Sequence, residues 1–392
     1  MNFILFEDNY THFLAPFSQM HTSFEVRCGL YTNLERLLEI LEPTDTVTLV
    51  VRDELHDLTA KRFSHIQVNP DMIEAGTWLN GATVWDKQNI NRIKSGHSFG
   101  KDGILLGFNT EENIKLDETD ELYKTMKSVT TQLSIKHISF LWDAINFSHN
   151  QIEEDFKGIS LRKKCEVHPS SVLLNSENIS IGKDSRISAG SILDASSGPI
   201  IIGSRVKIGI GSLIEGPAVI SSDSTVNPGT KLRGNVVIGP VCKIGGEVED
   251  SIFQGYSNKQ HDGFLGHSYV GEWVNLGANT NTSDLKNTYG NINFPFKDES
   301  IKTGEIFIGS MIGDYVRTGI STMLNTGSNI GTGSCIFGSG FQNKYVPPFT
   351  WGKKDHQQYE PFILSAERMK NRRKLKLGDA EKVRLADIYK SK

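Results

Sequence analysis

Long apolar runs are missing from this sequence, because no stretch approaches the roughly 20 consecutive apolar residues that a membrane span needs. An excess of charge of one sign is missing as well. The formal net charge of −4 gives no general attraction to nucleic acid or to an anionic membrane. Residues 1–8 lack the charged and long apolar segments of a signal peptide. We therefore expect no membrane span and no nucleic-acid partner.

Cysteine is scarce, and no two cysteines stand in a CxxC arrangement. The four are Cys28, Cys165, Cys242 and Cys335. Scattered thiols of this kind are typical of reduced cysteines in the cytoplasm, where we expect the protein to act. Glycine is the one unusual count, with 37 residues that crowd into the second half of the chain.

An aliphatic residue returns at every sixth position from Ile202 onward. Eight consecutive positions fit without a miss: Ile202, Ile208, Ile214, Ile220, Val226, Leu232, Ile238 and Ile244. The period of six resumes at Phe264, Val270 and Leu276, and again at Ile306, Ile312, Leu324, Ile330 and Ile336, broken only by Thr318. A glycine often follows the aliphatic residue, as in Ile202-Gly203.

A period of six fits neither an α-helix nor an ordinary strand. Hexapeptide repeats build a parallel β-helix, in which three flat sides make one coil and the aliphatic residues of successive coils stack inside. Glycine suits the tight bends between sides. We predict a left-handed parallel β-helix over residues 166–352, after an α/β nucleotidyltransferase-like region (1–155) and a linker (156–165), and before a helical tail (353–392).

The region before the repeat is predicted to mix strands and helices. Strands are expected over Phe3–Phe6 and Thr46–Val51, and helices over Leu30–Leu41 and Glu121–Leu133. The charged, amphipathic tail predicts a helix over Ser365–Tyr389 that closes the solenoid or packs on a partner. Its basic run, residues 370–374, is most simply a solvated face, with phosphate contact as the alternative.

The repeat is interrupted at Gln254–Asp262 and at Asn279–Glu305. Most repeat residues only build the core of a solenoid, so function is expected where the pattern breaks. The second interruption is a long polar insertion. It resembles the arm that trimeric β-helix enzymes extend over a neighbouring subunit.

His261 lies in the first interruption and is the candidate catalytic base. Acetyl transfer from a thioester to an amine needs a group that takes the amine proton, and histidine suits this because its ordinary pKa is ~6.5. His267, six residues later, is expected to be a bystander. A zinc site of three histidines, which γ-class carbonic anhydrases build on this fold, would need a third ligand nearby. His168 lies many coils away, so we predict no metal.

The segment His261–Gly266, followed by Val270–Ala278, resembles the acetyltransferase domain of the bifunctional enzyme that makes UDP-N-acetylglucosamine. The whole chain resembles a divergent GlmU-like subgroup of sugar nucleotidyltransferases. The stretches that carry this resemblance are Gly245–Val248, Ser257–Gly263, Asn279–Ser283 and Thr350–Gly352. The likeness is strong from about residue 165 to 352 and weak before that.

The resemblance implies acetyl-CoA as co-substrate, a homotrimer, and His261 as the base that deprotonates a glucosamine amine. It implies that Arg233 and Lys259 contact the sugar phosphate, and that Asn275 and Asp284 lie beside the sugar. The implied CoA groove, between subunits, is lined by Ala278, Arg317 and Thr318. Phe264 stands where the family has a tyrosine, so that hydroxyl is lost.

The N-terminal region departs further from the family pattern. Sugar nucleotidyltransferases need a glycine-rich loop after the first strand, whose amides hold the nucleotide phosphates. Residues 7–16 contain no glycine, and Met20-His21-Thr22 replaces the Thr-Arg-Pro of the subgroup. Asp8 and Arg27 are the remaining candidates for nucleotide binding.

Three functional hypotheses follow. The first is an acetyl-CoA-dependent N-acetyltransferase acting on an amino-sugar phosphate similar to glucosamine 1-phosphate. The second is a bifunctional enzyme whose first region also transfers a nucleotide with Mg²⁺. The third is a non-catalytic trimeric scaffold that binds sugar nucleotides. The missing glycine loop argues against the second hypothesis, and His261 with Arg233 and Asn275 argues against the third.

Overall fold

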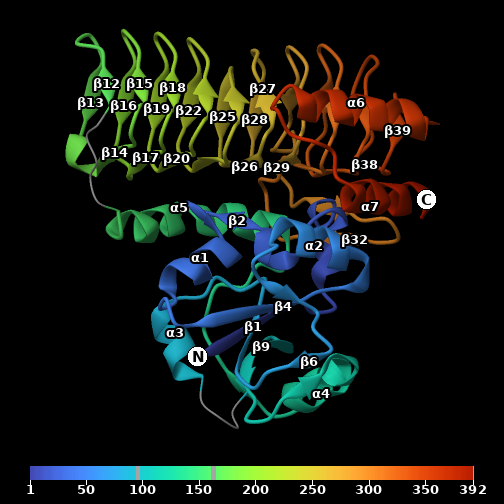
Figure 1. Ribbon diagram of the computed structural model, residues 1–392. Helices are drawn as coiled ribbons and strands as arrows, with labels where there is room; N and C mark the ends of the chain where they lie inside the picture. The colour runs from blue at the N-terminus through green and yellow to red at the C-terminus, as the bar shows by residue number, and fades with distance from the viewer. Residues whose placement is uncertain (94–97, 160–164, 392) are drawn as a thin grey trace.

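A computed structural model describes residues 1–93, 98–159 and 165–391. Figure 1 shows two parts: a long stack of β-coils and, beside it, a smaller region of strands and helices. No helix among these described residues has the length and apolar character needed to cross a bilayer.

The N-terminal region is built on a seven-stranded sheet with the order β11-β8-β9-β7-β1-β4-β5. Four neighbouring strands pair with one another in parallel: β1 (Asn2–Phe6), β4 (Thr46–Val50), β5 (Gln67–Val68) and β7 (Thr77–Asn80). The others are β8 (Ser98–Lys101), β9 (Ile104–Asn109) and β11 (Thr130–Gln132), of which β9 runs antiparallel to both β7 and β8. Two small pairs lie outside this sheet: β2 (Arg27–Cys28) with β3 (Tyr31–Thr32), and β6 (Met72–Ile73) with β10 (Ile114–Lys115).

Alternating side chains of β1 enter two different cores. Phe3 and Leu5 pack with Leu34 of one helix, whereas Ile4 and Phe6 pack on the opposite face of the sheet. Both faces are therefore covered, as expected for a largely parallel sheet. The covering helices are α1 (Asn33–Ile40), α2 (His56–Arg62), α3 (Lys87–Arg92) and α4 (Thr119–Lys127).

The two predicted strands of this region are confirmed as β1 and β4. The first predicted helix is confirmed with a later start, because Thr32 caps it with a hydrogen bond from the Glu35 amide to its side chain (3.1 Å). The prediction of a helix through Leu133 is wrong in its second half, since α4 ends at Lys127 and residues 130–132 form β11. Part of the predicted linker, residues 160–164, lies outside the described residues.

The coils form a left-handed parallel β-helix with three flat faces. The domain face, which lies against the N-terminal region, consists of β14 (Ile179–Ile181), β17 (Ile200–Ile202), β20 (Ala218–Ile220), β23 (Val236–Ile238), β26 (Ser251–Gly255), β29 (Tyr269–Glu272), β33 (Ser310–Ile312), β36 (Ser328–Ile330) and β38 (Tyr345–Val346). The tail face consists of β12 (Glu166–Val167), β15 (Arg186–Ile187), β18 (Lys207–Ile208), β21 (Thr225–Val226), β24 (Lys243–Ile244) and β27 (Asn258–Lys259), then β34 (Arg317–Thr318), β37 (Cys335–Ile336), β39 (Thr350–Trp351) and β40 (Asp355–His356). The open face consists of β13 (Val172–Leu174), β16 (Ile192–Asp194), β19 (Leu213–Glu215), β22 (Lys231–Arg233), β25 (Glu247–Glu249) and β28 (Phe264–Gly266), then β30 (Asn281–Thr282) and β35 (Met323–Leu324).

The predicted repeat is confirmed by the strand register over the first coils. Ile202 pairs with Ile220, and Ile220 pairs with Ile238, so that residues three hexapeptides apart stack in one row. All eight residues of the unbroken run are buried. Later the phase slips, because Val248 pairs with Leu265 and the coil between them is one residue short. Leu265, and not Phe264, therefore points inward.

The long insertion packs within its own chain, so the predicted arm over a neighbouring subunit is wrong. Its hairpin, β31 (Asn293–Pro295) and β32 (Ser300–Lys302), lies between the β-helix and the N-terminal region. Phe294 is fully buried and its ring lies 5.0 Å from that of Trp142. Ile306, which the period placed in the interior, is 43% exposed, because the coil resumes only later, with β33.

Helix α5 (Leu141–Lys157) was not predicted and joins the two parts of the molecule. It runs along the domain face in Figure 1. Its apolar residues share one core with outward residues of that face, such as Val219 and Val237. The single predicted tail helix is two helices, α6 (Tyr359–Asn371) and α7 (Asp379–Lys390).

Candidate active site

His261 stands at the corner between the tail face and the open face, which we call the outer edge. It follows β27 and precedes β28, and its side chain is exposed. Its imidazole makes no hydrogen bond or ion pair with any residue that the structure describes. Gly263 makes the turn possible: its φ is +124°, and a Cβ there would lie 2.2 Å from the Thr280 carbonyl oxygen. The tight turn therefore leaves the His261 imidazole exposed at the outer edge.

Lys259 holds this turn from inside the coil. It occupies the interior row, paired with Ile244, and is 2% exposed. Its ammonium donates hydrogen bonds to the carbonyls of Gly245 (2.9 Å), His261 (3.1 Å) and Gly263 (2.6 Å). Burial lowers the pKa of this amine to about 8, although Asp262 and Glu247 act in the opposite direction. The predicted phosphate contact is wrong, because all three protons are directed to backbone carbonyls in the interior.

The outer edge continues through the following coils. The Asn279 amide donates to the Asp262 carbonyl (2.9 Å), and the Ser321 amide donates to the Ala278 carbonyl (2.8 Å). Ala278, predicted to line the CoA groove, therefore lies on the coil next to that of His261. The side chain of Thr318 points inward instead: its hydroxyl accepts the Gly277 amide (2.8 Å), so its predicted contact with CoA is wrong.

The predicted Asn275 and Arg317 lie together on the tail face, beneath α6 of the same chain. They line a cavity of about 250 Å³ that Gln260, the neighbour of His261, also lines. Three further basic residues line this cavity: Lys243, Arg372 and Arg373. Burial and then the two arginines lower the pKa of Lys243, which shows how closely these charges gather. The basic run of the tail is therefore not simply a solvated face.

Arg233 and Asp284 lie on the open side of the coils, each already engaged. The Arg233 guanidinium lies 2.9 Å from Glu247 and from Glu249. The Asp284 carboxylate accepts a hydrogen bond from Nδ1 of His267 (2.9 Å). Burial lowers the pKa of His267, but this hydrogen bond and the charge of Asp250 raise it above its ordinary value. Sequence reasoning missed this pair, because the partners belong to different coils.

Asp8 lies at the carboxyl ends of the parallel strands, in a cleft of about 1030 Å³. It lies two residues after the end of β1, and Asn80 at the end of β7 donates a hydrogen bond to it (2.7 Å). Strands β4 and β7 flank β1 on opposite sides, so this is the point where the strand order reverses. Such switch points are where open α/β sheets bind ligands. The other carboxylates that line the cleft are Glu7, Asp53, Glu54, Asp71, Asp117 and Asp120.

Arg27 does not join Asp8 in this cleft, so its predicted nucleotide contact is wrong. It is 5% exposed, its guanidinium donates to the Leu30 carbonyl (2.6 Å), and its amide donates to the Tyr269 hydroxyl (2.9 Å). It therefore belongs to the contact between the N-terminal region and the β-helix.

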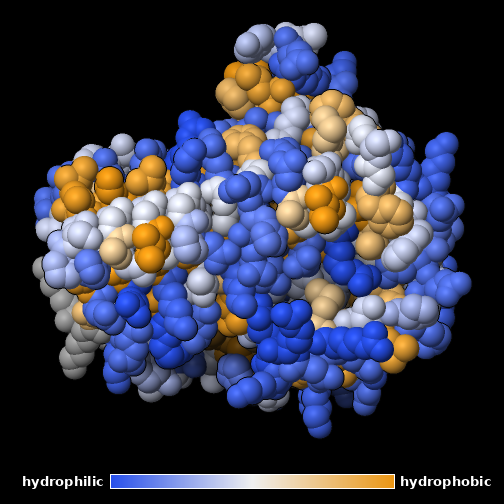
Figure 2. All heavy atoms as spheres, turned by 90° about the horizontal axis from the view of Figure 1, so that it is seen from above, coloured by the Kyte–Doolittle hydropathy of each residue, from blue (hydrophilic) through white to orange (hydrophobic). Residues whose placement is uncertain are grey.

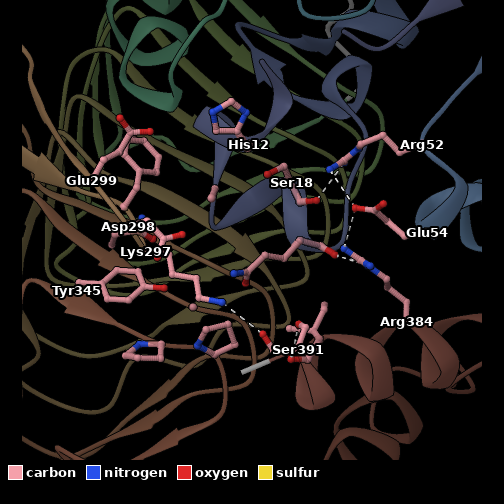
Figure 3. Close-up of a pocket in the computed structure, with 18 of the residues that line it drawn as sticks. His12, Ser18, Arg52, Glu54, Lys297, Asp298, Glu299, Tyr345, Arg384 and Ser391 are labelled. Carbon is pink, nitrogen blue, oxygen red and sulfur yellow. Dashed lines mark hydrogen bonds and ion pairs between the residues drawn. The ribbon is translucent and has the colours of Figure 1, made fainter. Parts of the chain in front are cut away.

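A second pocket, of about 680 Å³, lies where the N-terminal region, the insertion, the last coils and α7 meet. Figure 3 shows Arg52 and Arg384 directed toward Glu54, with Lys297 reaching toward Ser391 from the insertion. His12, Arg52 and Glu54 line both this pocket and the cleft of Asp8, so the two spaces adjoin.

Comparison with known proteins gives matches to both parts of the chain. Residues 3–164 match the family model of a sugar nucleotidyl transferase. The bifunctional sugar-1-phosphate nucleotidylyltransferase/acetyltransferase of Sulfurisphaera tokodaii is 32% identical over 151 residues, which is 38% of each chain. The bifunctional protein GlmU of Rippkaea orientalis is 36% identical over 107 residues, 27% of this chain and 22% of the relative. GlmU of Thermotoga petrophila is 25% identical over 67% of this chain and 56% of the relative.

Among solved structures, the UDP-N-acetylglucosamine acyltransferase of Campylobacter jejuni is 19% identical, with a TM-score of 0.28 over 48% of this chain and 72% of that chain. The matches span between 22% and 56% of the lengths of the three relatives named above. By sequence, this chain is similar to the GlmU-like proteins: residues 3–164 match the sugar nucleotidyl transferase model, and the part that follows is a hexapeptide-repeat β-helix.

Proposed function

We propose that the β-helix transfers an acetyl group from acetyl-CoA to the amine of an amino-sugar phosphate, in cytoplasmic nucleotide-sugar synthesis. One observation carries this proposal. His261 stands exposed on the outer edge, one residue after Gln260, which lines the cavity where Lys243, Arg317, Arg372 and Arg373 gather. A base and a cluster of cations beside it match a donor that carries phosphates and a reactive thioester.

The reaction needs one proton transfer at His261. The sugar amine attacks the thioester carbon, the C–N bond forms and the C–S bond breaks, and the CoA thiolate leaves. Nε2 or Nδ1 of His261 takes the proton that the amine loses. The basic side chains of the tail-face cavity hold the donor phosphates, with Asn275 beside them, while Ala278 leaves room along the edge for the rest of the donor.

Sugar phosphate binding is assigned to the open side of the coils. The Phe264 ring lies near Asp284, because a Cβ at Gly266 would meet both the Phe264 ring (2.6 Å) and the Asp284 carboxylate (2.3 Å). Arg233 contacts the phosphate in this proposal by exchanging Glu247 or Glu249 for it. That exchange costs little where the ion pairs are exposed to solvent, as the Arg233 side chain is at 49%.

A homotrimer is proposed because apolar side chains form a row on the open face. Val172, Ile192 and Leu213 pair in sequence along this face, and each is more than a third exposed. Figure 2 shows apolar residues gathered over these first coils, at the left of the view. Solvent-exposed apolar patches of this kind mark protein contacts. A partner packed here also brings a second wall to the outer edge.

The test is CoA release from acetyl-CoA with glucosamine 1-phosphate, compared between the native protein and His261→Ala. A general base contributes at least ~10²-fold, so turnover should fall by that factor or more. His168→Ala is the matched control, since His168 is also an exposed histidine of the β-helix. Equal turnover in native and His261→Ala protein would remove His261 from the mechanism.

Nucleotidyl transfer is a second candidate, favoured by the acidic cleft at the switch point of the sheet. Carboxylate oxygens are the ligands of Mg²⁺, which commonly uses one or two of them together with substrate phosphates. Asp8 and the carboxylates around it fit such an ion, and Mg²⁺ would neutralise phosphate charge there. UTP should then raise the melting temperature only with Mg²⁺, and Asp8→Asn should abolish this effect. Stabilisation that is the same without Mg²⁺ would contradict it.

A further inference from the structure

Three ligand-type side chains meet where the N-terminal region touches the β-helix. His21 follows the short helix Phe17–Gln19, Glu272 ends β29, and Asp314 follows β33 on the next coil. One imidazole nitrogen and one oxygen from each carboxylate lie within 4.8 Å of one another. No other group of this kind exists among the described residues.

Each ligand is held in place by its surroundings. The Glu272 amide donates to Oδ1 of Asp314 (2.9 Å), which turns Oδ2 toward Nε2 of His21 (2.9 Å). The ring of Phe17 stacks on His21 at 4.4 Å. On the other side of the imidazole, Oε1 of Glu25 lies 3.2 Å and Nη1 of Arg62 lies 3.1 Å from Nδ1, and Arg62 also donates to Glu25 (2.9 Å). A carboxylate that accepts the second ring N–H is the usual support of a metal-bound histidine.

The charges at this point do not balance. Three carboxylates, those of Glu25, Glu272 and Asp314, face Arg62 and at most one further positive charge on His21. A surplus negative charge in a buried place is costly. A divalent ion bound to a neutral imidazole, together with Arg62, would match the three carboxylates in full.

The carboxylate of Glu272 makes no hydrogen bond or ion pair with any described residue, although it is only partly exposed. Its backbone is engaged on both sides, since its amide donates to Asp314 and its carbonyl accepts from Tyr315 (2.9 Å). The side chain therefore lies beside His21 and Asp314 without a hydrogen bond of its own.

We propose that His21, Glu272 and Asp314 bind one divalent transition-metal ion, Zn²⁺ by preference, between the two parts of the molecule. One imidazole with carboxylates is a zinc-type donor set, and three protein ligands leave the fourth tetrahedral position to water. On binding, the proton at Nε2 of His21 is released and the metal takes its place. Because His21 comes from the N-terminal region and the carboxylates from two coils, the ion ties all three together.

The experiment uses the full chain, stripped with a chelator and titrated with Zn²⁺ by calorimetry and with Co²⁺ by visible absorption. We expect one equivalent of metal per chain, and a higher melting temperature with Zn²⁺ than without it. In Glu272→Gln the dissociation constant should rise by ~10-fold or more, with a metal-free melting temperature no lower than that of the native chain, because no described hydrogen bond is lost and the surplus charge is removed. These readouts do not depend on acetyl transfer.

Asp250→Asn is the matched control. His267 also has two carboxylates near it, but Asp284 and Asp250 lie at opposite ring nitrogens, 2.9 Å from Nδ1 and 3.6 Å from Nε2. This variant should bind metal like the native chain. The proposal is overturned if the native chain takes up no stoichiometric metal, if Glu272→Gln binds it equally well, or if Asp250→Asn is the variant that loses it.

Discussion

The first and the second half of the β-helix follow different rules. From Ile179 to Ile244 the coils are nearly uniform and the interior is apolar in every row. From Gly245 onward coils are shortened, the insertion interrupts them, and Lys259 and Thr318 occupy interior positions.

The regular half mainly stabilises the fold, whereas most of the candidate site residues lie in the irregular half. His261, the cavity residues Asn275 and Arg317, and the ligands Glu272 and Asp314 belong to the irregular half, whereas Arg233 and Lys243 lie at the end of the regular half. A uniform solenoid presents the same surface at every coil, so a distinct site requires that one coil differ from its neighbours. Shortened coils and polar interior residues provide that difference here.

Placing a lysine in the regular half should have the largest effect. Ile208 is fully buried in the row of Ile187 and Val226. Ile208→Lys should destabilise the protein by about 4 kcal/mol or more, because its ammonium would be buried without partners. The measurement is urea unfolding, with Ile208→Met as a control that should cost less than about 1.5 kcal/mol. If Ile208→Lys is tolerated, the two halves do not differ in the way described.

Lys259 should give the irregular half a distinctive pH dependence. Its pKa is lowered to about 8 by burial, whereas the unfolded chain keeps the ordinary value of ~10.4. Below pH 8 both states hold the proton, and between pH 8 and about 10.4 only the unfolded state holds it. Stability relative to Lys259→Met should therefore rise across this window, by roughly 3 kcal/mol in total. Thermal unfolding of both proteins from pH 7 to 10.5 measures it, and a flat difference would contradict the interior placement.

Thr318→Val should have the smallest effect of the three. Valine keeps the shape but leaves the Gly277 amide without its acceptor at 2.8 Å, which costs about 1–3 kcal/mol. Because Gly277 precedes Ala278, the Michaelis constant for acetyl-CoA should rise as well. Ile336→Val, in the same row of the next coil, is the control that should affect stability alone. Unchanged stability in Thr318→Val would mean that the hydroxyl is dispensable.

The fold was predictable where the sequence repeats and unpredictable where a coil loses residues. The eight aliphatic residues from Ile202 to Ile244 predict the regular coils, because each of them occupies the same inward position. The shortened coil before Leu265 shifts the phase by one, and the period alone cannot register that shift. Helix α5 does carry a helical pattern, since Leu141, Ile145 and Ile152 recur at intervals of four and seven and are buried in one core.

The candidate site was predictable only in part. His261 and Ala278 could be placed on the outer edge because short motifs surround them. Thr318 stands where the period expects an inward aliphatic residue, so its interior placement was foreseeable. The interior placement of Lys259 was not, since the coil that pairs it with Ile244 is shortened. The cavity of Lys243, Arg372 and Arg373 joins residues that are distant in sequence, and only the path of α6 brings them together.

Helix α5 has a mechanical consequence. A bare solenoid stretched along its axis opens coil by coil, because each coil touches only its neighbours. Here one continuous helix shares a core with Ile201, Val219, Val237 and Ile252, and Asn235 donates a hydrogen bond to the Ile145 carbonyl (3.1 Å). Coils cannot separate without shearing this helix off several strands at once. The load of a single coil is thereby shared along the length of the stack.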